Sequence, residues 1–367
     1  MKIGILKETS DKRVAIVPDL VKKWTEQKFE VLFENGCGEQ SNFSDDQYQQ
    51  AGGSGHKREE ILSNADILIV IKPLEDKETS KIKKGCLVIS NFQPFFKTDL
   101  IEDIAKKELS ALSLDMIPRI TIAQSMDVLS SMASIAGYKA VIMAADHLAR
   151  YFPMLTTAAG SIPPAKVLII GAGVAGLQAV ATARRLGAVV EAFDTRLAAK
   201  EEVESLGAKF VEVEGAKDDS SAGGYAVEQT EEYKQRQKEL IFEKCVKADV
   251  IITTAQLRGK PAPKLVTKEM VKEMKPGSVI VDLASSTGGN CELTEDNKTI
   301  VHDDVVIIGN SDLASEVPQH ASQLYSKNIE NYTKVFLKEG EYELDLENEI
   351  VKSSCMVKEG NLLYQKQ

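Results

Sequence analysis

Three glycines, Gly171, Gly173 and Gly176, have the spacing that dinucleotide-binding turns use. Gly171 would permit a tight turn, Gly173 would let backbone amides approach a pyrophosphate group, and Gly176 would let a helix pack closely on a strand. Asp194 follows Gly176 by 18 residues, and its carboxylate can accept hydrogen bonds from adenosine ribose hydroxyls. The same carboxylate would repel the 2′-phosphate of NADP, so these residues predict a site for NAD(H).

The segments around these glycines have to form a strand, a helix and a second strand for such a turn to work. Residues 166–170 are an apolar run, residues 174–187 have a helical pattern, and residues 189–193 are a second apolar run. Glycine turns before helices are common, and an aspartate at the end of a strand is often only a cap. The complete order of strand, turn, helix, strand and acid is what favours the dinucleotide site.

The composition of the chain limits the class of protein. Its 367 residues, 43% of them hydrophobic, suffice for two domains of ordinary size. The net charge of −10 argues against nucleic acid or an anionic lipid surface as the main partner. No apolar run approaches the roughly 20 residues that cross a bilayer. We therefore expect a soluble chain without direct membrane insertion, which can still dock on a membrane protein.

The cysteines and histidines predict neither a disulfide framework nor a metal site. The cysteines are odd in number and contain no Cys-x-x-Cys pair, which is typical of reduced thiols. The histidines have no neighbours at metal-ligand spacing, so we expect no bound metal. These residues are Cys37, Cys86, Cys245, Cys291 and Cys355, with His56, His147, His302 and His320.

Alternating strands and helices predict an α/β protein with two Rossmann-like domains, each built on a parallel sheet, separated by a cleft and joined by long helices. Expected helices of the first domain are residues 18–27 and 99–107, and the expected connectors are residues 125–151 and 318–337. Strands are expected at residues 2–6, 29–33, 67–71, 86–90 and 112–116, and later at 208–213, 249–253, 278–283 and 305–308.

The domain boundaries follow from this alternation. The tail, residues 339–367, reads as short strands around 348–351 and 356–363 that complete the first domain. The N-terminal domain is thus expected to be discontinuous, covering residues 1–127 and 328–367. Residues 128–327 would form the Rossmann NAD(H)-binding domain.

A polar insertion, residues 215–237, interrupts the second domain. It contains Gly223 and Gly224 in its middle, with Tyr225 directly after them. Long irregular insertions in compact domains are either lids over a site or solvated surface loops, and both interpretations remain open for this segment.

Several stretches of the chain carry a resemblance to one family. They are residues 4–8 with 13–18, residues 119–127 (RITIAQSMD), 129–140 (LSSMASIAGYKA), 171–176, 192–196 (AFDTR), 222–225 (AGGY) and 284–292 (ASSTGGNCE). Together they resemble the NAD(H)-binding subunit of the proton-translocating nicotinamide nucleotide transhydrogenases, over residues 1 to about 360. The wider superfamily also contains alanine dehydrogenase.

This resemblance implies specific roles for residues of the site. The family has an Arg–Gln–Asp loop near the nicotinamide, matched here by Arg119, Gln124 and Asp127. Gln124 would lie between two nucleotides, while Arg119 and Asp127 would hold the nicotinamide end, although the two could instead form an ordinary surface ion pair. The other implied contacts are Ser130, Val174 beneath the pyrophosphate, Asp194, Thr195 and Arg196 at the adenosine, Thr254, Ala255, and Gly224 with Tyr225 in a mobile loop that closes over the nucleotide.

The resemblance also implies an activity and partners. NADH would pass hydride directly to NADP⁺ bound on a partner subunit, and membrane-spanning subunits would couple the transfer to proton translocation. The chain would be a homodimer, cytoplasmic and peripheral on the inner face of the cytoplasmic membrane through those subunits. A chain from which a membrane segment had been removed would read the same.

Two alternatives remain at this point. An alanine dehydrogenase needs an acid/base group, but its histidine would align near Gln93 and its aspartate with Ser286, and it lacks the insertion at 215–237. Arg13 and Lys72, where that enzyme holds a substrate carboxylate, are retained. An NAD-sensing module would bind NADH and transfer hydride to nothing.

Overall fold

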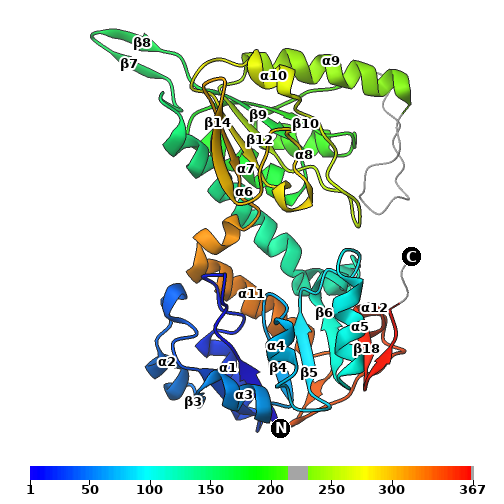
Figure 1. The fold of residues 1–367 in the computed structure, drawn as a ribbon. Helices are drawn as coiled ribbons and strands as arrows, with labels where there is room; N and C mark the ends of the chain where they lie inside the picture. Colours follow the sequence, from blue (N-terminus) through cyan, green and yellow to red (C-terminus); the bar gives the residue numbers. More distant parts are fainter. Residues whose placement is uncertain (214–229, 365–367) are drawn as a thin grey trace. The chain divides into compact units, whose positions relative to one another are not determined.

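The computed structural model describes residues 1–213 and 230–364, and the chain divides into two compact units (Figure 1). Unit 1 comprises Met1–Met132 and Ser315–Gln367, and unit 2 comprises Ala133–Ala314. The sequence analysis placed the two boundaries after residues 127 and 327, whereas the units divide the chain after residues 132 and 314. Unit 1 therefore contains both ends of the chain.

Unit 1 is built on an eight-stranded sheet that is buried on both faces. Ile67 and Ile69 join one hydrophobic cluster while Leu68 and Val70 join another, because successive side chains of a strand point to opposite faces. Strands β1 to β6 run parallel, as expected, but β18 and β19 add an antiparallel edge. The order is β19 (Asn361–Leu362), β18 (Cys355–Lys358), β6 (Ser110–Ser113), β5 (Leu87–Ser90), β4 (Ile67–Ile69), β1 (Lys2–Ile5), β2 (Glu30–Glu34) and β3 (Ser54–His56).

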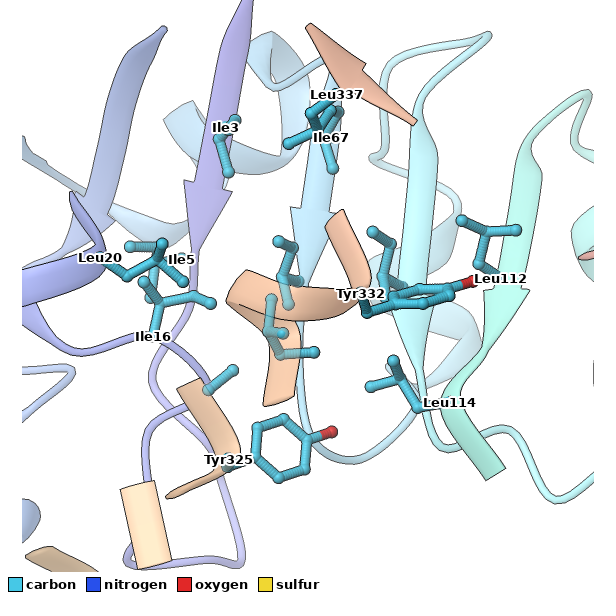
Figure 2. Close-up of a cluster of buried hydrophobic side chains, with 14 of the residues drawn as sticks. Ile3, Ile5, Ile16, Leu20, Ile67, Leu112, Leu114, Tyr325, Tyr332 and Leu337 are labelled. Atoms are coloured by element: carbon cyan, nitrogen blue, oxygen red, sulfur yellow. The ribbon is translucent and has the colours of Figure 1, made fainter. Parts of the chain in front are cut away.

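Helix α11 (Pro318–Thr333) lies across one face of this sheet, together with α1 (Pro18–Glu26). Figure 2 shows its Tyr325 and Tyr332 among aliphatic side chains from the strands. The opposite face is covered by α3 (Arg58–Asn64) and α5 (Thr98–Lys106). The core of unit 1 is thus made partly by a helix that follows strand β6 by about 200 residues along the chain.

Two expectations for unit 1 are wrong. Residues 348–351 are not a strand, because Asn348 accepts hydrogen bonds from the backbone N–H groups of Ile350 and Val351 and so caps helix α12 (Glu349–Ser354). The strand expected at residues 112–116 ends earlier, since β6 stops at Ser113 and Leu114–Met116 is a 3₁₀ turn. The strands expected within 356–363 are confirmed, because β18 and β19 form a hairpin that pairs with β6.

Unit 2 has the strand order of a dinucleotide-binding Rossmann fold. Successive strands are added on one side of the first strand and then on its other side. Val167 and Ile169 face one buried cluster and Leu168 and Ile170 face the other, as in sheets covered on both sides. The parallel strands are, in spatial order, β11 (Lys209–Phe210), β10 (Val189–Phe193), β9 (Lys166–Ile170), β12 (Val250–Thr253), β13 (Val279–Asp282) and β15 (Val305–Gly309). An unexpected strand, β14 (Lys298–His302), pairs antiparallel with β15.

Helix α6 (Val128–His147) packs against the start of α7 (Val174–Arg185). A Cβ on Gly137 would lie 2.1 Å from the carbonyl oxygen of Ala175, so the two helices are in close contact. By length and composition, α6 is also the one described helix that could cross a membrane, so the expectation that no apolar run has bilayer length is wrong here. A core helix passes the same test, and Ala140 and Ala144 of α6 are fully buried.

Residues 231–237 of the expected insertion are not irregular. Thr230 accepts a hydrogen bond from the backbone N–H of Tyr233 and starts helix α9 (Glu231–Lys247), so residues 231–237 are helical. The predicted site residues Gly224 and Tyr225 lie outside the described residues. Unit 2 also has an unexpected hairpin of β7 (Leu155–Thr157) and β8 (Gly160–Ile162), which extends beyond its sheet (Figure 1).

Candidate functional site

The glycine turn joins β9 to α7 and leaves no room for larger side chains at two positions. Gly171 has a φ of +99°, in the region that favours glycine. A Cβ on Gly171 would lie 2.6 Å from Oγ1 of Thr254. A Cβ on Gly176 would lie 1.8 Å from the carbonyl oxygen of Gly171. The two ends of the turn are therefore in close contact with each other, and the turn also packs closely against the end of strand β12.

The start of α7 has room for an anion, in contrast to the closed turn. Gly173 is the N-cap residue, and no side chain caps the helix. Apart from Gly173 and its two chain neighbours, no heavy atom of the described residues lies within 4 Å of where a Cβ on Gly173 would stand. The first N–H groups of a helix lack intrahelical partners, and the helix dipole places a partial positive charge beside them. Val174, the next residue, is exposed. The position fits the pyrophosphate of a dinucleotide.

Asp194 links the glycine turn to the end of strand β10. Its Oδ2 accepts a hydrogen bond of 2.7 Å from the backbone N–H of Ala172. Its Oδ1 accepts 2.8 Å from the N–H of Arg196, and both oxygens accept from the Arg196 guanidinium, each at 2.9 Å. Thr195 lies between these partners and is half-buried. The carboxylate at the predicted ribose position is thus held in place and paired with a cation.

Replacing Asp194 by alanine is expected to weaken NADH binding about 30-fold, because hydrogen bonds from ribose hydroxyls to a charged acceptor contribute roughly 2 kcal/mol. The affinity for NADPH should fall less or rise, since Arg196 is then available to a 2′-phosphate. Fluorescence titrations with both nucleotides measure the change, and Asp146→Ala, at an exposed aspartate of α6, is the matched control. Unchanged affinities for both nucleotides would contradict the assignment of Asp194.

Asn290 holds the segment after β12, and sequence reasoning did not single it out. The fully buried Asn290 accepts a hydrogen bond from the N–H of Ala255 at 3.0 Å and donates to the carbonyl oxygens of Ala255 and Pro263, both at 2.8 Å. Thr254 donates its hydroxyl to the carbonyl oxygen of Gly171 at 2.9 Å. Thr254 and Ala255 are therefore fixed beside the glycine turn.

The segment with the predicted Arg–Gln–Asp loop belongs to unit 1. It contains the 3₁₀ helix η3 (Thr121–Met126), in which Gln124 is exposed, and Arg119 is exposed just before it. Asp127 caps α6, because its carboxylate accepts from the backbone N–H of Ser130 at 2.9 Å and from the Ser130 hydroxyl at 2.6 Å. Asp127 and Ser130, two predicted contacts of the nicotinamide end, are thus in direct contact.

The structure gathers the predicted residues into two sets. One set lies at the carboxyl ends of β9, β10 and β12 in unit 2, where Rossmann folds bind nucleotides: Gly171, Gly173, Val174, Gly176, Asp194, Thr195, Arg196, Thr254 and Ala255. The other set lies in unit 1: Arg119, Gln124, Asp127 and Ser130. Among the described residues, no group of His, Cys, Asp and Glu could hold a metal ion, and all five cysteines are buried free thiols.

Unit 1 also contains a buried group of charged side chains around Arg13 and Lys72. Asp11 accepts a hydrogen bond of 2.8 Å from Nε of Arg13, and Nζ of Lys72 lies 3.7 Å from Oδ2 of Asp11. Glu8 accepts from the N–H of Ile71 at 2.6 Å and of Lys72 at 3.3 Å. Burial raises the pKa of Glu8 from 4.5 to about 7, because removal from water disfavours its charged form.

Replacing Glu8 by glutamine is expected to flatten the pH dependence of stability. Because the pKa of Glu8 is raised by folding, its stabilising contribution is fully present below the unfolded value of 4.5 and is lost as the pH rises through about 7. The difference in free energy of unfolding, variant minus wild type, should therefore increase by about 2 kcal/mol from pH 5 to pH 8. Urea denaturation at both pH values measures this shift, and a constant difference would argue against it.

Comparison with known proteins supports the superfamily that the sequence resembles. The family model "Alanine dehydrogenase/PNT, N-terminal domain" matches residues 4–136, and "Alanine dehydrogenase/PNT, C-terminal domain" matches residues 140–365. The solved structure of an L-alanine dehydrogenase superposes with a TM-score of 0.81 at 24% identity, covering 99% of this chain and 96% of that one, which shows a shared fold. The chain belongs to the alanine dehydrogenase/PNT family.

Transhydrogenases are the more similar relatives within this family. A relative from Rhodospirillum rubrum, named as the first part of an NAD(P) transhydrogenase subunit alpha, is 44% identical and covers 99% of this chain and 98% of its own. "NAD(P) transhydrogenase subunit alpha" of Haemophilus influenzae is 42% identical and covers 98% of this chain and 71% of its own. The transhydrogenase structure from Sinorhizobium meliloti superposes with a TM-score of 0.90 at 41% identity, covering 99% and 100%. The resemblance to NAD(P) transhydrogenase alpha subunits is thereby confirmed.

Proposed function

We propose that this chain passes hydride directly from bound NADH to NADP⁺ held on a partner subunit. NAD(H) is the cofactor of the transhydrogenase alpha subunits with which the chain groups. The transfer breaks the C4–H bond of one nicotinamide and forms a C4–H bond on the other, so no proton has to be supplied or removed. The protein then needs to bind, orient and exclude water rather than to titrate.

The observation that carries this proposal is a complete dinucleotide turn combined with neutral side chains where a dehydrogenase needs titratable ones. Gln93 and Ser286, near which the histidine and aspartate of alanine dehydrogenase would align, are both exposed, and a glutamine cannot exchange a proton. The dinucleotide turn itself has the closed geometry at Gly171 and Gly176 and the open position at Gly173. The site can therefore bind a nicotinamide nucleotide but lacks these acid/base groups.

Each set of residues has a separate task in this proposal. Backbone N–H groups at the start of α7 would hold the pyrophosphate, with Val174 beneath it, while Asp194, Thr195 and Arg196 hold the adenosine end. Arg119, Asp127 and Ser130 would orient the nicotinamide end, and Thr254 and Ala255, at the end of β12, would also contact the nucleotide. Gln124 would lie between the two nicotinamides, and Gly224 with Tyr225 would close over the nucleotide.

The proposed partners follow from the family. NADP(H) would be held by a second subunit, and membrane-spanning subunits would couple hydride transfer to proton translocation. The chain would act as a homodimer, peripheral on the cytoplasmic face of the membrane. The net charge of −10 and the name "subunit alpha" of the relatives support docking on proteins rather than on anionic lipid.

Two assays of NADH oxidation separate this function from its alternatives. With the NADP(H)-binding subunit of a transhydrogenase and NADP⁺, the chain should oxidise NADH and form NADPH. With pyruvate and ammonium alone it should not oxidise NADH. Oxidation that depends on pyruvate and ammonium would indicate an amino-acid dehydrogenase, and NADH binding without oxidation in either assay would indicate a sensing module.

A further inference from the structure

Helix α11 positions the segment that contains Gln124, although the two lie about 200 residues apart in the chain. The helix is fixed in the core of unit 1 by Tyr325, Ile329 and Tyr332, which are fully buried. Figure 2 shows Tyr325 and Tyr332 projecting from α11 into this cluster. A helix held in this way is a rigid support for whatever its other side chains contact.

Two asparagines of α11 bind the same backbone atom of η3. Nδ2 of Asn328 donates to the carbonyl oxygen of Ser125 at 2.8 Å, and Nδ2 of Asn331 donates to the same oxygen at 3.2 Å. Ser125 directly follows Gln124, so fixing the carbonyl group of Ser125 restrains the backbone next to Gln124. A carbonyl oxygen has two lone pairs, and both are engaged here by side chains of one helix.

Asn328 buries a polar atom that has no hydrogen-bond partner in the described part of the chain, which costs free energy and which packing does not explain. Asn328 is 7% exposed, and its Oδ1 is buried without a hydrogen-bond partner among the described residues. An apolar residue at this position would avoid burying an unpaired polar atom. The amide at this position therefore indicates a role for the bond to Ser125 beyond packing.

Buried neighbours complete the support for Gln124. Ala123 and Met126, on either side of Gln124 and Ser125, are 1% and 9% exposed and belong to the same core cluster as Tyr325. Asp127 then caps α6 through Ser130. The backbone around Gln124 is thus held by three sets of contacts: the buried neighbours, the bonds from α11 and the helix cap at Asp127. The side chain of Gln124 stays exposed.

We infer that Asn328 is a positioning residue for hydride transfer, which acts through the Ser125 carbonyl to fix Gln124, with Asn331 in a lesser role. This inference rests on the proposed function of Gln124. Because a displacement of about 1 Å can slow a reaction up to 100-fold, loss of this bond is measurable in the transfer rate without loss of nucleotide binding.

The test measures hydride transfer to NADP⁺ in the reconstituted transhydrogenase complex, together with NADH affinity and thermal unfolding. Asn328→Leu is expected to slow transfer about tenfold and to change the NADH Kd by less than about twofold. Asn331→Leu should slow it about twofold, since water can replace a half-buried donor. Gln323→Leu, at an exposed amide of the same helix, is the control. If the leucine variant folds poorly, Asn328→Asp is measured in its place. This change keeps the shape of the side chain and replaces the donor by an acceptor, so it should also slow transfer about tenfold.

A double variant separates positioning from general stability. In the Gln124→Asn background, Asn328→Leu should slow transfer by less than about twofold, while its effect on unfolding stays the same in both backgrounds. Equal slowing in both backgrounds would overturn the inference. If transfer is slow in Gln124→Asn but normal in Asn328→Leu and Asn328→Asp, this inference alone is overturned. If the transfer rate of Gln124→Asn is unchanged, the role of Gln124 and this inference are overturned together.

Discussion

Replacing Gln124 by asparagine is expected to slow hydride transfer about 100-fold while changing the Kd of NADH by less than about threefold. The shorter side chain keeps the amide but moves it by about one C–C bond length, away from the place where it would separate and align two nicotinamides. The proposed nucleotide contacts of the glycine turn and Asp194 lie in unit 2, which this change does not touch. Single-turnover transfer rates and NADH titrations measure the two quantities separately.

The control for this change is Gln50→Asn, at an exposed glutamine at the end of α2 (Asp45–Gln50) in the same unit. It removes the same methylene group far along the chain from the Arg–Gln–Asp segment, so transfer and binding should both remain at the wild-type level. A Gln124→Asn variant with a normal transfer rate would remove Gln124 from the mechanism. Equal losses in transfer and in NADH affinity would show that it binds rather than positions.

Two alanine substitutions in the glycine turn are expected to weaken NADH binding for different reasons. In Gly176→Ala the new Cβ would stand 1.8 Å from the carbonyl oxygen of Gly171, so α7 has to move away from β9. We expect the Kd of NADH to rise at least about 100-fold, as the backbone N–H groups leave the pyrophosphate position. The free energy of unfolding should fall by about 2 kcal/mol, in the range of overpacked core positions.

Gly173→Ala separates binding from folding within the same turn. Apart from Gly173 itself and its two chain neighbours, no heavy atom in the described part of the chain lies within 4 Å of the new Cβ, and the φ of −76° suits alanine. Stability should therefore be unchanged or rise by about 0.5 kcal/mol. The methyl group would, however, occupy the space proposed for the pyrophosphate, so NADH binding should weaken by at least about tenfold. Isothermal titration and chemical denaturation of both variants measure these effects, and normal NADH affinity in Gly173→Ala would place the pyrophosphate elsewhere.

Local patterns in the sequence predicted the Rossmann unit well. The order of apolar run, glycine turn, helix and second run requires neighbours in the chain only, and β9, α7 and β10 form as expected. Runs such as residues 250–253 read as strands because they are buried on both faces of a parallel sheet. The antiparallel edges formed by β14, β18 and β19 depend on pairing across the sheet, which period and composition do not reveal.

The wrong expectations have identifiable local causes. Ile350 and Val351 favour strands by propensity, but the Asn348 cap and burial against the sheet of unit 1 make this segment a helix. Residues 231–237 are mostly polar and were read as loop, yet Thr230 caps helix α9 there. In both cases a capping residue was present in the sequence and outweighed the average character of the segment.

The supporting residues of the site could not be read from sequence because their partners are far away. Asn290 binds Ala255 across 35 residues, and Asn328 binds Ser125 across 203. Helix α11 also buries Ser322, which accepts a hydrogen bond from the backbone N–H of Val14 at 2.9 Å. Polar residues that serve distant backbone groups look like surface residues until the fold places them.

The most direct test of the account follows the transferred hydrogen itself. NADH carrying deuterium at the transferred C4 position is mixed with this chain and the NADP(H)-binding subunit loaded with an NADP⁺ analogue of distinct absorbance. We predict rapid reduction of the analogue that requires this chain, with the deuterium retained at C4 of the product and none released to water. Reduction with loss of the label to solvent, or no reduction while NADH is bound, would contradict direct hydride transfer.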